Sequence, residues 1–480
     1  MTRQYAAIPP QAAKTGGGLK KGEREAVTTS AATLGWWGIL RLGLVQTCLG
    51  AIVVLTTSTI NRIMVVELAL PAMLPGVLVA IHHAVQMSRP RFGHGSDVGG
   101  RTTGWIIAGM AILGLGGVGA AAGTNLLATD RVFGFLLCTA SFTAIGLGAS
   151  AAGTSLLVTL AKHVEPHRKA AAASIVWIMM IAGFAITAGT AGHFLDPFSP
   201  ARLLVVTSFV SAMAFLVTLL ALYRLEPRKE LATPDDGASK AAPGQFRAAL
   251  RTVWREPDAR RFTIFVFVSM LAYSAQDLIL EPFAGTVFGM TPGQSTQLAG
   301  VQHGGVLFGM LLVATTTMLR RNASLTVLRS WSVGGCLASA VALMAIAWGG
   351  SAAPVWPLAA NVFLLGLANG AFAVAAIAAM MTLAGRGAAR REGVRMGLWG
   401  ASQAIAFALG GFLGTVAIDI SRALIADAAT AYAWVFGAEA GLFIFAAMIG
   451  LHLRAGDESG AREAMPSFGD VAMVEVLDAR

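Results

Sequence analysis

The sequence predicts an all-α integral membrane protein with twelve transmembrane helices in two six-helix halves. First, 55% of its 480 residues are hydrophobic and only 12% are charged, with a mean hydropathy of +0.67. An ordinary soluble domain is about one-quarter charged. Second, twelve apolar runs are long enough to cross a bilayer, which takes about 20 residues. Third, Lys and Arg fall mainly on one side of this topology, as the positive-inside rule requires.

Each predicted span is an apolar run that ends at charges, prolines or polar clusters. The N-terminal half, 36–223, holds spans at 36–60, 70–88, 104–127, 132–161, 170–193 and 202–223. The C-terminal half, 262–452, holds spans at 262–288, 298–319, 326–349, 356–384, 396–418 and 431–452. Outside the halves we expect a disordered tail at 1–35, a linker at 224–261 and a second tail at 453–480. Part of the linker reads as an amphipathic interfacial helix or as a solvated helical linker.

The distribution of basic residues orients the chain. When both termini and the even-numbered connections between spans are placed on one side, that side holds 31 of the 35 Lys and Arg residues. The other side keeps only Arg62, Arg131, Arg202 and Arg422. We therefore expect both tails and the linker in the cytoplasm. The net charge of +10 is then explained by cytoplasmic loops, and no nucleic-acid partner is expected.

Several function classes are disfavoured by missing motifs. The three cysteines are isolated, which argues against a disulfide framework or a thiolate zinc site. The GxGxxG match at 114–119 lies inside an apolar span with no preceding strand, so it reads as a helix-packing surface. No P-loop, HExxH, GxSxG or Asp-rich prenyltransferase motif occurs. We expect no enzymatic activity and no metal ion of the protein's own.

The loop after the second span carries a recognisable motif. Gly93 is followed by an acid four residues on, Asp97, by Gly100 at seven and by Arg101 at eight. Glycine gives the backbone freedom for a tight turn. The carboxylate and the guanidinium are suited to clasping neighbouring helices. This pattern resembles the loop signature of the major facilitator superfamily, whose members consist of two six-helix halves.

Longer stretches resemble one branch of that superfamily. They are 41–86 with 89–101, the segment WREPDARRFTIFVFVSMLAYSAQDLILEPFAG and its continuation to 309, and more weakly 396–414. All three are similar to the PucC/LhaA family, also called the bacteriochlorophyll delivery family. The resemblance covers most of residues 36–452. The tails and the ninth and twelfth spans contribute little to it.

The resemblance implies a light-harvesting complex assembly factor in the inner photosynthetic membrane of a bacterium. It implies that the chain binds or delivers bacteriochlorophyll, as cargo, to antenna and reaction-centre polypeptides. Pigment-synthesis enzymes such as chlorophyll synthase are further expected partners, besides membrane lipid. Within the family the chain looks most like the member that accompanies pigment-synthesis enzymes.

Three histidines are candidate pigment ligands. His82 and His83 lie in the second span, and His303 lies in its counterpart, the eighth. A neutral imidazole nitrogen is a suitable axial ligand for the magnesium of a tetrapyrrole, and ionisable residues inside a membrane are functional candidates. The alternative interpretation is an interhelical hydrogen bond, worth roughly 1 kcal/mol.

Six polar residues form a second candidate set, a central gate or docking element. Each half places an amide, a charge and a glutamate in its first span: Asn61, Arg62 and Glu67 in one, and Gln276, Asp277 and Glu281 in the other. Asp277 and Glu281 share one helical face, and we expect Arg62 to pair with Asp277. A structural ion pair near the membrane surface is the alternative interpretation.

A second function stays open at this point. The two-half fold, the Asp97 and Arg101 loop, and Asp277 with Glu281 also fit a proton-coupled secondary transporter of a small solute. Against it, the first span has no interior charge before Arg62 and the fourth has no basic residue before Lys162. The predicted interior of the N-terminal half therefore offers few charged side chains that could bind a charged solute.

Overall fold

The computed structural model describes residues 34–88, 102–165, 168–225, 251, 254–319, 324–385 and 392–452. The N-terminal helices are α1 (Trp36–Val54), α3 (Met73–Val85), α5 (Thr102–Leu126), α6 (Arg131–His163), α7 (Lys169–Leu195) and α8 (Pro200–Leu222). The C-terminal helices are α10 (Pro257–Phe288), α11 (Pro292–Leu319), α12 (Leu325–Gly349), α13 (Leu358–Gly385), α14 (Glu392–Leu424) and α15 (Ala428–Leu451). Both predicted tails and most of the linker lie outside the described residues.

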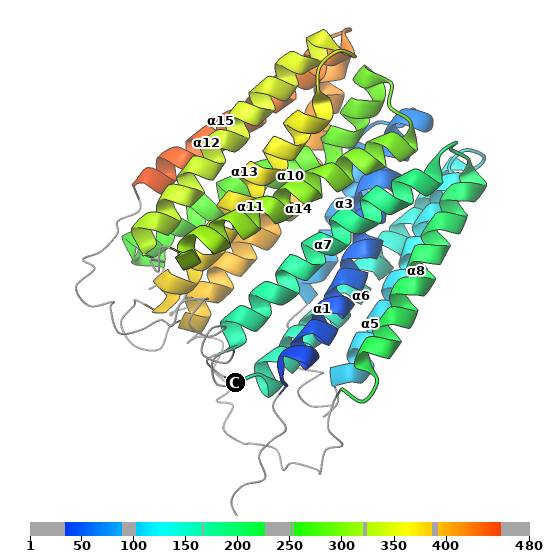
Figure 1. Ribbon diagram of the computed structural model, residues 1–480. Coiled ribbons are helices and arrows are strands. Elements are labelled where there is room, and N and C mark those ends of the chain that lie inside the picture. The colour runs from blue at the N-terminus through cyan, green and yellow to red at the C-terminus, as the bar shows by residue number, and fades with distance from the viewer. Residues whose placement is uncertain are drawn as a thin grey trace, which may run out of the picture.

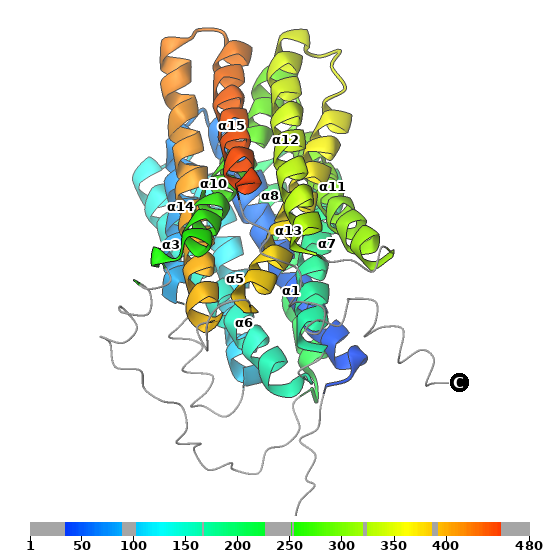
Figure 2. The ribbon, with the colours of Figure 1, turned by 90° about the vertical axis from the view of Figure 1, so that its left-hand side faces the viewer.

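The helices form two bundles, each with its own hydrophobic core. In Figure 1 the N-terminal helices, blue to green, group on one side and the C-terminal helices, green to red, on the other. Figure 2 shows the same helices running roughly parallel or antiparallel. One core consists of residues from α1 to α8 joined by Leu278, and the other of residues from α10 to α15 joined by Val65 and Ala72. The all-helical fold of two six-helix halves is confirmed.

The first span is longer than the sequence predicts. After Val54 it continues through a π-helical segment (Leu55–Thr59), the short helix α2 (Ile60–Arg62) and a second π-helical segment (Ile63–Glu67). The hydroxyls of Thr56 and Thr57 donate to the carbonyl of Val53 within this span. Such back-bonding competes with the helical ladder, and π-helical turns are frequent at functional sites. Because the helix continues to Glu67, the predicted end of the first span at residue 60 is wrong.

The second span begins at Met73, three residues later than predicted. Its α-helix, Met73–Val85, is followed by a 3₁₀ turn, Gln86–Ser88, and residues 89–101 lie outside the description. Among the described residues, eleven helices are long and apolar enough to span a membrane, and α3 is a twelfth, shorter apolar helix. The chain is a multi-pass integral membrane protein.

Glycines allow the close helix crossings. A Cβ added to Gly109 of α5 would lie 2.5 Å from the backbone nitrogen of Ala152 in α6, and one added to Gly116 would lie 3.0 Å from the nitrogen of Ile145. Small residues let membrane helices approach in this way. The GxGxxG run of α5 is thus a helix-packing surface, as predicted.

The two halves are joined at one end of the molecule, where the first span ends and α3 begins. We call this the closed end. Asp419 of α14 accepts hydrogen bonds from the backbone nitrogens of Ala72 and Met73, at 2.8 and 2.7 Å. On the other side, Asp196 after α7 accepts from the hydroxyl of Thr291, at 2.7 Å, and from the backbone nitrogen of Gly293, at 3.2 Å. Each carboxylate therefore caps a helix of the opposite half.

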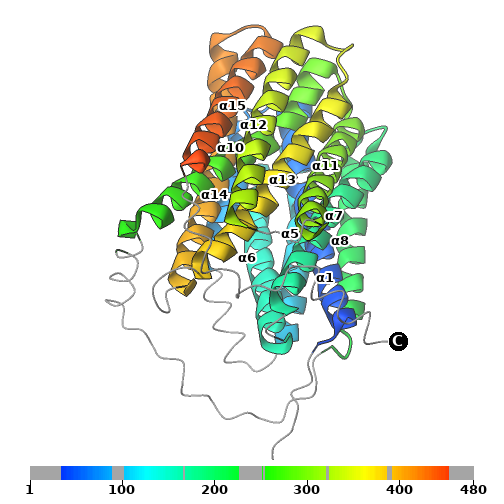
Figure 3. The ribbon, with the colours of Figure 1, turned by 60° about the vertical axis from the view of Figure 1, so that its left-hand side comes forward.

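These two caps are related by the internal repeat. In each case the fifth helix of one half, α7 or α14, ends beside the beginning of the second helix of the other half, α11 or α3. Figure 3 shows α7 beside α11. Parallel repeats related by a two-fold axis produce such paired contacts. The closed end is thus held by the same chemistry on both sides.

Removing the caps should loosen the closed end. We expect Asp419→Ala or Asp196→Ala to lower the free energy of unfolding by about 1–2 kcal/mol, the usual range for a lost helix cap. The double variant should also speed labelling of a cysteine introduced at Thr59, which is buried there. Both effects are measured in detergent, by thermal unfolding and by thiol labelling of a background without the native cysteines.

The matched control is Asp130→Ala. Asp130 also caps a helix, through the backbone nitrogens of Val132 and Phe133, but within the N-terminal half. It should lower stability without changing labelling at residue 59. Equal labelling in all variants would show that the two cross-half caps do not hold the closed end.

Candidate functional site

Asn61 and Arg62 lie inside the first span and reach the C-terminal half. The amide of Asn61 donates to the carbonyl of Leu278 at 2.6 Å. The Arg62 guanidinium donates to Glu67 Oε1 at 2.5 Å and to the carbonyl of Met290 at 2.6 Å. Its side chain is only 2% exposed. A buried cation is tolerated where a charge pairs with it and its hydrogens find acceptors.

The predicted pairing of Arg62 with Asp277 is wrong. The partner of Arg62 is Glu67, five residues on in the same span and 35% exposed. The π-helical segment Ile63–Glu67 widens the turn and brings these two residues together. Sequence spacing assumes ordinary α-helical turns and therefore does not reveal this pair.

Glu281 completes the charged cluster. It accepts a hydrogen bond from the hydroxyl of Ser58 across the two halves and lies within electrostatic range of Arg62. Gly285, one turn further along α10, makes room for the guanidinium, because a Cβ there would lie 2.9 Å from Arg62 Nη2. Arg62, Glu67 and Glu281 thus form one charged cluster at the closed end.

Asp277 and Gln276 do not join this cluster. Asp277 is half-buried and accepts a hydrogen bond from the amide of Gln302 at 3.2 Å. Gln276 is fully buried, and its amide has no hydrogen-bond partner within the part of the chain that the structure describes. The six predicted gate residues therefore lie in three environments. Four belong to the charged cluster or lie beside it, Asp277 binds Gln302, and Gln276 is buried in the interior of the C-terminal half.

His82 and His83 point in different directions from α3. His82 is buried and shares a hydrogen bond of 2.7 Å with Gln86, one turn on in the same half. His83 is half-buried, and its ring lies 5.9 Å from that of Phe407 in α14, in the other half. Of these two adjacent residues, only His83 faces the interface of the halves.

His303 lies where α11 crosses α7. It is 9% exposed, its ring centroid lies 5.0 Å from that of Phe184, and its Nδ1 atom has no hydrogen-bond partner among the described residues. A Cβ added at the next residue, Gly304, would meet nothing within 4 Å. The imidazole therefore packs against an aromatic ring, and the next residue along the helix borders open space.

The loop signature Gly93, Asp97, Gly100 and Arg101 lies outside the described residues, so its geometry stays a prediction. No group of three or more His, Cys, Asp or Glu residues suited to a metal ion occurs among the residues described.

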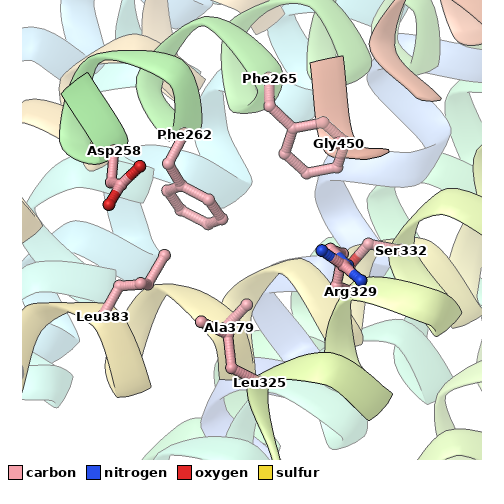
Figure 4. Close-up of a pocket in the computed structure, with 9 residues that line it drawn as sticks. All are labelled: Asp258, Phe262, Phe265, Leu325, Arg329, Ser332, Ala379, Leu383 and Gly450. Atoms are coloured by element: carbon pink, nitrogen blue, oxygen red, sulfur yellow. The ribbon is translucent and has the colours of Figure 1, made fainter. Parts of the chain in front are cut away.

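A pocket lies at the end of the C-terminal half opposite the closed end. It is lined by residues of α10, α12, α13 and α15. Figure 4 shows Asp258 and Arg329 on opposite sides of it, with Phe262 and Phe265 on the wall formed by α10. None of the three candidate histidines lines this pocket.

Sequence reasoning missed Ser58 and Gln302, which bind Glu281 and Asp277. The run of Thr and Ser at 56–59 inside an apolar span was a usable signal, because hydroxyls at membrane depth form interhelical hydrogen bonds. Gln302 gave no comparable signal, because it is not part of such a run of hydroxyl side chains.

Comparison with known proteins decides the family. A family model described as PUCC protein matches residues 59–457. The chain belongs to the PucC family. It is 52% identical over 417 residues to "Bacteriochlorophyll synthase 44.5 kDa chain" of Rhodobacter capsulatus, an alignment that covers 87% of this chain and 95% of that protein. It is 27% identical to "Protein PucC" of Cereibacter sphaeroides, covering 86% and 90% of the two chains.

Solved structures show the fold of this PucC-family chain. The nucleoside transporter NupG superposes with a TM-score of 0.63 at 13% identity, covering 87% of this chain and 99% of the transporter. A bacterial homologue of the lysosomal transporter Spinster gives a TM-score of 0.59 at 17% identity, covering 92% and 98%. At such low identity these matches show the major facilitator fold alone.

The charged cluster yields a double-variant prediction. Arg62→Met should destabilise the protein by about 3–5 kcal/mol, the usual cost of leaving a buried charge without its partner. Adding Glu281→Gln removes one of the two stranded carboxylates and should restore about 1 kcal/mol or more. Thermal unfolding in detergent is measured for wild type, Arg62→Met, Glu281→Gln and the double variant, which are the four corners of the cycle. Strict additivity would show that Arg62 and Glu281 do not interact.

Proposed function

We propose that this chain is a light-harvesting complex assembly factor that binds bacteriochlorophyll and delivers it to antenna and reaction-centre polypeptides in the photosynthetic membrane. The observation that carries the proposal is its 52% identity, over nearly the whole length, to a protein named as a chain of bacteriochlorophyll synthase. The relatives named PucC support the same role.

The proposed pigment ligand is His303. A magnesium tetrapyrrole needs an imidazole nitrogen with a free lone pair and an apolar surface for the macrocycle. The unpartnered Nδ1 atom of His303, the ring of Phe184 and the open space at Gly304 meet these needs. His83 is the second candidate, because it faces the interface of the halves through Phe407. His82 is the weakest, since Gln86 already engages its ring.

We further propose that the chain itself is not an enzyme and acts beside pigment-synthesis enzymes such as chlorophyll synthase. A prenyl-transfer enzyme needs paired acids to hold magnesium diphosphate, and the sequence carries no such motif. The name of the relative then reflects partnership with the enzyme. Membrane lipid is the remaining proposed partner. We propose no nucleic-acid partner.

The proposed location is a bacterial inner, photosynthetic membrane with both termini in the cytoplasm. The distribution of Lys and Arg supports this orientation. The closed end, where Arg62 lies, would then face away from the cytoplasm.

The alternative function is proton-coupled transport of a small solute. The observation that favours it is Asp277, a half-buried carboxylate held by Gln302 between helices of the fold that transporters use. Substrate-specific uptake into liposomes, abolished by Asp277→Asn, would support this alternative over pigment delivery.

Pigment binding is testable by purification. The wild-type chain, purified from a phototrophic host in mild detergent, should carry bacteriochlorophyll absorption bands and co-purify with antenna or reaction-centre polypeptides. His303→Leu should lower the molar ratio of pigment to protein at least several-fold, because the axial bond is lost. The ratio is measured from the absorption spectrum of the folded, monodisperse fraction.

The matched control is His193→Leu, an exposed histidine at the end of α7. It should leave the pigment ratio unchanged. A wild-type protein without pigment, whose deletion leaves the antenna absorption bands of the cell intact, would contradict the assembly role. Pigment retained in full by His303→Leu would contradict only the choice of ligand.

A further inference from the structure

A layer of polar side chains crosses the interior of the C-terminal half at mid-membrane depth. Asp277 lies eleven residues before the end of α10, Asn369 eleven after the start of α13, and Glu439 eleven after the start of α15. All three helix ends lie at the closed end. At 1.5 Å per residue, each side chain lies about 16 Å along its helix from the closed end. This depth is near the middle of the hydrocarbon core of a bilayer, which is about 30 Å thick.

Glu439 and Gln276, the residue before Asp277, are buried without hydrogen-bond partners among the described residues. Glu439 is 3% exposed and Gln276 is fully buried. Among the described residues, neither carboxylate oxygen of Glu439 and neither polar atom of Gln276 has a partner. Buried polar groups are normally satisfied, so two such side chains require an explanation.

Helix register places these two side chains opposite each other. The ring of Phe283 in α10 contacts Tyr432 and Phe436 in α15, with centroids 5.3 and 5.1 Å apart. Gln276 lies two turns before Phe283, and Glu439 lies two turns after Tyr432. Because α10 and α15 run antiparallel, both steps lead to the same level on the facing surfaces.

A second carboxylate lies close by. Asp277 is within electrostatic range of Glu439 and also interacts with Tyr273. The other ionisable side chains that the structure describes on helices packed against α15 lie away from this level or are thiols: Glu281, Asp419 and Arg422 toward the closed end, Asp258, Arg260, Arg261 and Arg329 toward the opposite end, and Cys336 on α12. Two neighbouring carboxylates without a basic partner attract a cation.

We propose that Glu439, Asp277 and Gln276 form a binding site for a small monovalent cation, a proton or Na⁺, inside the C-terminal half. The carboxylate oxygens supply the charge, and the Gln276 amide oxygen adds a neutral ligand. Hard oxygen ligands suit both cations. The proposed pigment ligand His303 is none of these three side chains, so either proposal stands if the other fails.

The test uses the purified full-length protein in detergent. Its thermal unfolding midpoint is measured against NaCl at constant ionic strength, with choline chloride as the balancing salt, and separately against pH without sodium. A wild-type midpoint that rises with Na⁺ identifies sodium, and one that falls as the pH is raised, without a sodium effect, identifies a proton. In either case Glu439→Gln should abolish the dependence, because the amide carries no charge to neutralise.

Two further variants keep the test decisive if Glu439→Gln folds poorly. Gln276→Leu keeps both carboxylates but removes the neutral ligand, and it should weaken the sodium dependence several-fold. The matched control is Asp427→Asn, an exposed carboxylate at the start of the same helix, α15. Hydrogen bonds from the hydroxyl and backbone nitrogen of Thr430 hold the pKa of Asp427 below its usual value. This control should keep the full wild-type cation dependence.

The carbonyl stretching band of a protonated carboxylic acid gives an independent readout in the infrared. If a proton is the ligand, wild type should show this band at neutral pH, shifted in D₂O, and Glu439→Gln should lose it. The same sodium and pH dependence in wild type, Glu439→Gln and Gln276→Leu, with an unchanged infrared spectrum, would overturn the proposal.

Discussion

The low dielectric of the bilayer is the constraint on which this structure depends. Within it, an unpaired charge or hydrogen-bonding group is expensive, so a buried charge needs a partner that neutralises it. Arg62 shows how this is done: Glu67 neutralises it, the carbonyl of Met290 accepts one of its hydrogens, and Gly285 leaves room for its guanidinium. Glu67 belongs to the same half as Arg62, whereas Met290 and Gly285 belong to the other half. The contacts that satisfy this one cation therefore also join the two bundles.

The same constraint explains why the two halves meet where they do. At the closed end, carboxylates cap helices of the opposite half, and the backbone donors at the start of α3 and α11 are satisfied by Asp419 and Asp196. Toward mid-membrane the contacts change to ring packing, with His83 against Phe407 and His303 against Phe184. At this depth both halves therefore contribute aromatic rings to their contact.

The C-terminal half differs from the N-terminal half in its interior. It holds Asp277, Glu439 and Gln276 at one depth, whereas the charged residues of the first span gather near the closed end. Two bundles of the same helix order thus carry different buried chemistry, one for joining the halves and the other for the proposed cation site. A cation held beside Asp277 would tune the electrostatics of the interface that His83 and His303 face.

The sequence alone determined the class of protein, because hydropathy, span length and the placement of Lys and Arg are set by the solvent each segment must enter. It also determined the family, through long matching stretches. Only the tertiary structure decided which polar residues meet. Arg62 pairs with Glu67 across a π-helical turn, and Asn61 donates to the carbonyl of Leu278 in the other half. Side-chain pairing between helices depends on their rotation and crossing, which distant packing contacts fix and local spacing does not encode.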